Sequence, residues 1–491
     1  MKLKNSDITL LCKVVDNYGD IGVVFRLAKS LSALLPDGGA GLRLIVDNLE
    51  AFAQLSPGVD VSKPLQEHRS WTVCQWDAVD EGRALYTERL PLVIVECFAC
   101  GRPEWLDDIL FDKSLQALRP NPVQIINLEY LTAEPYADEF HKLQSLTRSA
   151  QVRKVNFMPG FTDKTGGLIL DGVPLAAGNG CSAKDAPLVE GGTPAAGGAL
   201  CTEATASSGE AGETHADTPA AGGSLVSSGS GSYCADRRNP FTVLVFSYER
   251  DFSTIADALA SFATERATSP QNAAHTTLAN LRVLVAAGKS DAPFSAAWKA
   301  ACDSRQAQNA ALEGCPWGNA TASLPAPEKL AFLPQDEWDK LLYSADFLFI
   351  RGEDSLSRAC LSGKPFVWHA YPQSEMYHLV KVRALLDRME PFFSKENFRL
   401  IRDYWLWYNG DAPDTTDKTD ATGSTHNARF GAQPSTNTLD AANTGYDSRA
   451  ALIEILSRYE EMQKSFCAFT KNLIKNGNLA EHLMTFIEEI V

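Results

Sequence analysis

Two carboxylates stand four residues apart in an early loop, Asp16 and Asp20 of the sequence DNYGDIG. An apolar run of β type over residues 8–15 precedes the loop, and apolar residues at helical spacing follow it. In an α/β sheet such a loop opens onto the crevice where ligands bind, so Asp16, Asn17, Gly19 and Asp20 are candidate substrate-binding residues. Two carboxylates can hold a cation, a hydroxyl or a metal; alternatively, they only form the turn and cap the helix.

A second candidate group lies in FIRGEDSLSR, residues 349–358, where another apolar strand is predicted to lead into a helix. Asp354 or Ser355 can cap that helix, whose first amides and positive dipole end suit a phosphate. Arg351 adds a permanent cation, and Glu353 could accept hydrogen bonds from sugar hydroxyls. The alternative is a capped surface helix with an exposed Arg and Glu.

Aromatic residues follow two other predicted strands in the same half of the chain. Phe246 and Tyr248 end one strand, and Phe332 with Gln335 follows another. Aromatic faces with one amide suit a nucleobase, although each aromatic taken alone is more often a core residue. Tyr371, after a further buried strand, could reach a donor phosphate.

The elements that would position these residues alternate between strand and helix, which predicts mostly parallel sheets. In the first half, strands are expected at residues 42–47, 91–98 and 122–131, with helices at 48–55 and 105–118. In the second half, strands are expected at 241–248, 281–288, near 332 and at 345–352, with helices at 254–262 and 338–343. The pattern predicts two Rossmann-like domains that face each other across a cleft, an arrangement found in the GT-B glycosyltransferases and also in other two-domain α/β enzymes.

Two polar tracts interrupt the pattern. The first is rich in Gly, Ala and Ser and the second in Asp, Thr and Asn, so neither can bury enough apolar surface to fold. The expected organisation is an N-terminal Rossmann-like domain (1–175), a disordered insertion (176–239), a C-terminal Rossmann-like domain (240–409), a second disordered insertion (410–446) and a helical segment (447–491) that could pack on either domain.

Composition limits the class of protein. A chain of 491 residues exceeds a single core, and its net charge of −16 disfavours sequence-independent nucleic-acid binding. The eleven cysteines form no disulfide framework, and the close pair Cys97 and Cys100 is a weak zinc or redox signal. No apolar run reaches the length of a membrane span, so a cytoplasmic protein is expected.

Five segments in the same order resemble the EarP family, the protein-arginine rhamnosyltransferases of bacterial elongation factor P. They are DNYGDIGVVFRLAKSL (16–31), INLEYLTAE (126–134), FMPGFTDKTGGL (157–168), FLPQDEWDKLL (332–342) and RGEDSLSRACLSGKPFVWHAYPQ (351–373). The resemblance implies an inverting GT-B enzyme without a metal or other cofactor. It would move L-rhamnose from dTDP-β-L-rhamnose to an arginine of elongation factor P.

The resemblance also implies roles for the candidate residues. Asp16 and Asp20 would receive the acceptor arginine, with Asp20 as the base. The thymidine pocket would comprise Phe246, Tyr248, Phe332 and Gln335. The diphosphate and sugar contacts would come from Arg351, Glu353, Asp354, Ser355 and Tyr371, and Glu353 would join Asp16 and Asp20 as a catalytic residue. The first domain would thus bind the acceptor and the second the nucleotide sugar.

Two alternatives to this function stay open at the level of sequence. One is a sugar-nucleotide-dependent GT-B enzyme that acts on a small-molecule acceptor. The other is a non-catalytic partner of elongation factor P.

Overall fold

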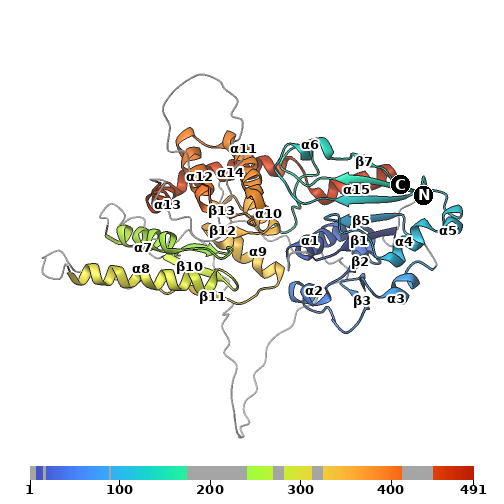
Figure 1. Ribbon diagram of the computed structural model, residues 1–491, viewed down its shortest axis with the longest axis horizontal. Coiled ribbons are helices and arrows are strands. Elements are labelled where there is room, and N and C mark those ends of the chain that lie inside the picture. Colours follow the sequence, from blue (N-terminus) through green and yellow to red (C-terminus); the bar gives the residue numbers. More distant parts are fainter. Residues whose placement is uncertain are drawn as a thin grey trace, which may run out of the picture.

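The computed structural model describes residues 7–14, 18–87, 90–173, 240–268, 281–311, 324–411 and 446–491. They form two α/β domains side by side (Figure 1). Asp16, Asn17 and nearly all of both expected polar insertions lie outside the described residues.

The first domain is built on an eight-stranded sheet in the order β3-β4-β2-β1-β5-β6-β8-β7. Its six central strands are parallel, and only β3 and β7 pair antiparallel, at the two edges. The strands are β1 Ile8–Cys12, β2 Arg43–Val46, β3 Leu65–His68, β4 Trp71–Gln75, β5 Val93–Cys97, β6 Val123–Leu128, β7 Gln144–Ser145 and β8 Val152–Phe157.

Helices cover both faces of this sheet, because alternate residues of each buried strand point to opposite sides. Leu10 of β1 packs in the core beneath α1, whereas its neighbour Leu11 packs in the core beneath α4. The helices are α1 Gly19–Leu34, α2 Leu49–Leu55, α3 Val79–Ala84, α4 Glu104–Phe111, α5 Lys113–Ala117 and α6 Tyr136–Phe140.

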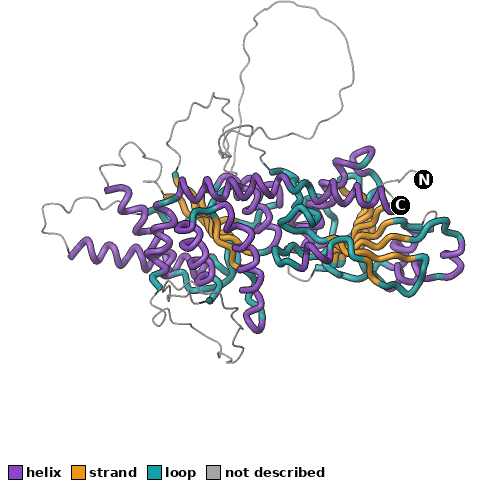
Figure 2. Tube along the Cα trace, turned by 90° about the horizontal axis from the view of Figure 1, so that it is seen from above, coloured by secondary structure: helices purple, strands orange, loops and turns teal. Residues whose placement is uncertain are grey.

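The second domain contains a five-stranded sheet in the order β11-β10-β9-β12-β13, with every pair parallel. Helices again surround the strands, and the two sheets are separate bodies when seen from above (Figure 2). The strands are β9 Phe241–Val245, β10 Leu281–Ala286, β11 Glu328–Leu330, β12 Phe347–Arg351 and β13 Phe366–His369. The helices are α7 Ser253–Thr268, α8 Asp291–Ala311, α9 Gln335–Ser344, α10 Glu353–Ser362, α11 Tyr377–Met389, α12 Lys395–Tyr408, α13 Ser448–Ser457 and α14 Tyr459–Lys475.

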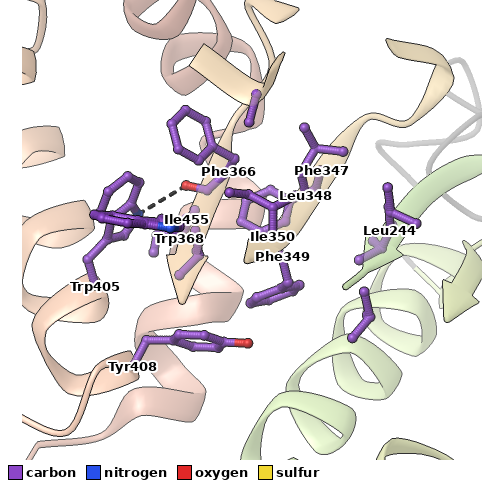
Figure 3. Close-up of a cluster of buried hydrophobic side chains, with 14 of the residues drawn as sticks. Leu244, Phe347, Leu348, Phe349, Ile350, Phe366, Trp368, Trp405, Tyr408 and Ile455 are labelled. Carbon is purple, nitrogen blue, oxygen red and sulfur yellow. Dashed lines mark hydrogen bonds between the residues drawn. The ribbon is translucent and has the colours of Figure 1, made fainter. Parts of the chain in front are cut away.

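Aromatic residues fill the core between β12, β13 and α12 (Figure 3). Phe349 stacks on Tyr408 with ring centroids 5.5 Å apart. The Trp405 indole Nε1 donates a hydrogen bond to the Phe366 carbonyl over 3.0 Å, which satisfies the one polar atom of a fully buried ring. This rigid core supports the strand that ends at Arg351.

The predicted fold class, α/β with two Rossmann-like domains in the GT-B arrangement, is confirmed by these two sheets and by the way the domains meet. One local prediction was wrong. The helix expected over 105–118 breaks at Asp112, whose side chain accepts from the Leu115 amide and starts α5. The segment 447–491 is helical, as expected, and contains three helices; Gly477, with a φ of +89°, separates the second from α15, Leu479–Ile490.

The last helix, α15, returns to the first domain and lies along it, in red in Figure 1. Its apolar residues Leu483 and Ile487 are fully buried in the same core as Leu27 and Leu31 of α1. In contrast, Leu452 of α13 and Phe466 of α14 are buried in the core of the second domain. The terminal helices therefore pack on both domains.

Candidate active site

A pocket of about 270 Å³ lies between the two domains, at the carboxyl ends of the central strands. Its first-domain wall comes from the start of α1 and the end of α2, through Tyr18, Gly19, Gly22 and Leu55. Its second-domain wall follows β9, β10, β11 and β12. Both domains therefore contribute to the wall of the pocket.

The structure brings most of the predicted site residues to this pocket. The predicted residues that line it are Gly19, Phe246, Phe332, Gln335, Arg351, Glu353, Asp354 and Ser355. Asp20, Tyr248 and Tyr371 are not among the lining residues. Asp20 directly follows the lining residue Gly19, the guanidinium of the lining residue Arg351 lies over Tyr248, and Tyr371 contacts Tyr248.

Asp20 lies in the first turn of α1 and is only 3% exposed. Its Oδ1 accepts a hydrogen bond of 3.1 Å from the hydroxyl of Tyr130, whose ring stacks on Phe98 at 4.5 Å. Burial raises the pKa of Tyr130, and the nearby charges of Asp20 and Glu353 raise it further, so this hydroxyl keeps its proton. Asp20 therefore has a fixed donor, and Glu353 lies near enough to act on the same phenol.

Arg351 ends β12 with its guanidinium over two aromatic rings. Its Cζ lies 4.5 Å from the ring centroid of Phe246 and 4.7 Å from that of Tyr248. The buried Nε of Arg351 has no hydrogen-bond partner in the part of the chain that the structure describes. The rings of Tyr371 and Tyr248 are T-shaped to each other with centroids 5.4 Å apart, and Tyr371 is 59% exposed. The aromatic rings thus fix the cation at the pocket, and an anionic ligand would supply the missing partner.

Helix α10 starts at the pocket in a way that the sequence did not predict. Capping by Asp354 or Ser355 was wrong: the N-cap is Gly352, with φ +74° and no side-chain cap. The first helical bond runs from the Leu356 amide to the Gly352 carbonyl at 3.1 Å. The N–H groups of a helix's first turn have no partner inside the helix, and here that turn lines the pocket and suits an anion.

The side-chain amide of Gln335 is held in one orientation in the pocket wall. Its Nε2 donates to the Gly22 carbonyl at 2.7 Å, while its buried Oε1 has no partner among the described residues. A buried acceptor of this kind needs a donor, such as the ring N–H of a pyrimidine. Phe332, opposite Tyr18 with ring centroids 4.8 Å apart, offers an aromatic face in the same pocket.

Asp354 lies in the pocket wall, but its carboxylate faces the first domain. Both of its oxygens accept from Arg26 of α1, at 2.9 Å each. Burial by itself would raise the pKa of Asp354, but the Arg26 charge and hydrogen bonds outweigh burial, so the pKa lies below the ordinary value of an aspartate. Its predicted role as a direct donor contact stays a prediction.

Sequence reasoning missed several residues of the site, namely Tyr18, Arg26, Tyr130 and Trp338. Trp338 donates from Nε1 to the Ser355 hydroxyl at 3.3 Å, and its ring meets Phe246 edge-on at 4.9 Å. One signal was available for Arg26, because it is the only charge within the apolar run VVFRLA.

The cysteine pair near this site carries free thiols. Cys97 is fully buried, and burial raises the pKa of its thiol, with Cys100, Asp20 and Glu96 adding to the effect. Among the residues that the structure describes, no three His, Cys, Asp or Glu side chains are grouped as a metal site. Within the same residues no helix is long and apolar enough to cross a membrane.

Comparisons with known proteins agree on a family. Residues 8–488 match the model of the family described as "Elongation-Factor P (EF-P) rhamnosyltransferase EarP". A protein-arginine rhamnosyltransferase of Pseudomonas putida is 31% identical over 413 residues, which cover 82% of this chain and 86% of that protein. Its counterpart in Pseudomonas aeruginosa is 30% identical over 407 residues, with the same two coverages.

A solved structure from work on EarP-mediated arginine glycosylation of translation elongation factor EF-P aligns with 98% of this chain and 99% of that chain. The TM-score is 0.43 and the sequence identity 18%. At that score the alignment adds nothing to the family assignment, which rests on the sequence relationships. This chain belongs to the EarP family, and it is a glycosyltransferase.

Proposed function

We propose that this protein transfers L-rhamnose from dTDP-β-L-rhamnose to an arginine side chain of elongation factor P, with inversion at the anomeric carbon. The observation that carries the proposal is the division of charge across the pocket. The first domain places the buried carboxylate Asp20 directly after the lining residue Gly19, and the second offers the cation Arg351 and the start of α10 in the pocket wall. The names of the family and of its relatives support the acceptor.

On the donor side, thymine would lie on Phe332 and pair its ring N–H with Gln335 Oε1. The diphosphate would be bound by Arg351 and by the first-turn amides of α10. As the bond between the anomeric carbon and dTDP breaks, the leaving diphosphate gains negative charge, which these groups stabilise. The proposal includes no metal ion or other cofactor.

On the acceptor side, a guanidinium is a poor nucleophile because its lone pairs are delocalised and it stays protonated. Asp20, together with Asp16 four residues before it, would hold the planar group and turn one nitrogen toward the anomeric carbon. As the C–N bond forms, the nitrogen loses a proton to Asp20. Glu353, which lines the pocket near Tyr130, would bind the sugar.

The test is intact-mass analysis of elongation factor P after incubation with this protein and dTDP-β-L-rhamnose. We expect a mass increase of one deoxyhexose, located on an arginine by peptide sequencing and absent with Asp20→Ala. An unmodified factor, in a reaction that consumes the donor, would instead support an enzyme with a small-molecule acceptor. The proposed place of action is the cytoplasm, as for an enzyme that modifies a translation factor.

A further inference from the structure

Arg26 is fully buried, and it joins the two domains through two carboxylates. From α1 of the first domain, its Nε and Nη2 donate to Asp354 at 2.9 Å each. Its Nη1 and Nη2 donate to Asp339 of α9 at 2.5 and 3.0 Å. One guanidinium thus holds two helices of the second domain.

The place where Arg26 binds α10 is the part of that helix that lines the pocket. Asp354 stands between Glu353 and Ser355, and all three are lining residues in the first turn. The direction of the first-turn amides therefore depends on where the Asp354 side chain is held. Arg26 itself does not line the pocket, so it can act on a ligand only through the two helices that it holds, α9 and α10.

A second contact beside this ion pair shows how closely the domains approach. Gln335 Nε2 bonds the Gly22 carbonyl of α1 at 2.7 Å and lies 3.4 Å from Asp354 Oδ2. A Cβ at Gly22 would lie in ordinary van der Waals contact with that Nε2 at 3.4 Å and with Asp354 Oδ2 at 4.0 Å, so this face of α1 packs directly against both side chains. The orientation of Gln335 is thus set by the same face of α1 that carries Arg26.

The two carboxylates require this cation. Asp339 is 6% exposed and the side chain of Asp354 is 16% exposed. Without Arg26, two neighbouring carboxylates with little access to water would repel each other. Lysine keeps the charge but lacks the planar fork that reaches both carboxylates with paired hydrogen bonds. Substitution at position 26 should therefore disturb α9 and α10 together.

We propose that Arg26 is a positioning residue of the donor site, placed in the acceptor domain: it holds Asp354 and Asp339 and so sets the start of α10 against the pocket. The nucleotide part of this inference rests on the proposed function. Donor binding then depends on the acceptor domain without contact between Arg26 and the donor.

The test compares Arg26→Lys with Lys29→Gln, a matched control from the next turn of α1. Lys29 also bridges the domains, to Asp336 of α9 at 2.5 Å, but its ion pairs do not include α10. Hydrogen–deuterium exchange of the ligand-free protein, followed in peptides covering α10, reads the start of that helix without any donor. We expect faster exchange in Arg26→Lys and unchanged exchange in Lys29→Gln; equal exchange in the two variants would overturn the proposal.

Calorimetry with dTDP and steady-state kinetics complete the test. Arg26→Lys should weaken dTDP binding and raise the donor KM about tenfold, with kcat at saturating donor within about twofold of wild type. If Arg26→Lys does not fold, Asp339→Asn, which removes one arm of the ion pair outside the pocket, should raise the donor KM in the same direction. A donor KM no higher than that of Lys29→Gln would contradict the role of Arg26. Failure of the wild type to bind dTDP would refute the proposed donor instead, and the exchange comparison would still decide the role of Arg26.

Discussion

The Tyr130 hydroxyl donates a hydrogen bond to Asp20 Oδ1 over 3.1 Å, from the loop after β6 to the first turn of α1. This bond fixes one oxygen of the proposed base and leaves the ring of Tyr130 stacked on Phe98. Tyr130→Phe keeps the stack and removes the donor, so it should lower kcat about tenfold, since a hydrogen bond to a charged group contributes roughly 1.5–3 kcal/mol. The measurement is the initial rate of transfer to elongation factor P.

Tyr86→Phe is a matched control for that prediction, because the Tyr86 hydroxyl bonds Thr9 at 2.8 Å in the same domain and away from the pocket. It should leave the transfer rate unchanged. An equal loss of rate in both variants would show that Tyr130 acts only through stability.

Asp20→Asn should separate chemistry from donor binding. Asn cannot take a proton from the acceptor nitrogen, so kcat should fall by about 10²–10⁴-fold. Asp20 is not among the residues lining the pocket, so the affinity for dTDP measured by calorimetry should stay within about twofold. A variant that retains more than a tenth of the wild-type rate would exclude Asp20 as the base.

Arg351→Met should weaken binding of the donor's diphosphate without weakening binding of its thymine. Arg351 lies against Phe246 at the pocket, and its cation is proposed to bind the diphosphate. The variant should therefore bind dTDP more weakly by about tenfold or more, whereas its affinity for thymidine, which carries no phosphate, should be unchanged. Parallel titrations with both ligands measure the difference; an equal loss for both would place Arg351 at the nucleoside instead.

His369 should make stability depend on pH below neutrality. Burial lowers the pKa of this histidine to about 3, with nearby cations adding to the effect, and its Nδ1 shares a 2.7 Å hydrogen bond with Ser247. Between pH 6.5 and 3 the unfolded chain binds a proton that the folded protein does not, so stability falls as the pH falls through that window. From pH 6.5 to pH 5 the loss at this site is about 1.6 kcal/mol.

The variant His369→Asn removes that titration. Its melting temperature should therefore decrease less than that of wild type between pH 7 and pH 5, whatever its stability at pH 7. His141, whose pKa is lowered to about 4 by burial first and then by Lys142, acts in the same direction in both proteins and cancels from the comparison. Identical pH profiles would contradict the buried neutral His369.

The parts of the site that the sequence predicted follow from a local rule. Phe246, Arg351 and Glu353 were found because the end of a parallel strand and the start of the next helix are recognisable from neighbouring residues. The same rule predicted the two sheets. It failed at Gly352, because a φ of +74° moves the helix start without any polar side chain to mark it.

The parts that the sequence did not predict depend on contacts between distant segments. Arg26 meets Asp339 and Asp354, which follow it by 313 and 328 residues, and no periodicity within α1 specifies those partners. For the same reason no local pattern around Asp354 indicates that its carboxylate faces a guanidinium of the other domain. The fold class could therefore be predicted from the sequence, whereas the contacts between Arg26 and its two carboxylate partners could not.

Helix α15 has a consequence for how the protein is made. It supplies Leu483 and Ile487 to the core beneath α1, yet it begins at Leu479, 322 residues after β8 ends at Phe157. A ribosome that adds about 5–20 residues per second leaves roughly 15–60 s between these two points of the chain. The first domain is thus the first to leave the ribosome and the last to be completed. Until α15 has been translated, the apolar side of α1 lacks the residues that cover it in the folded protein.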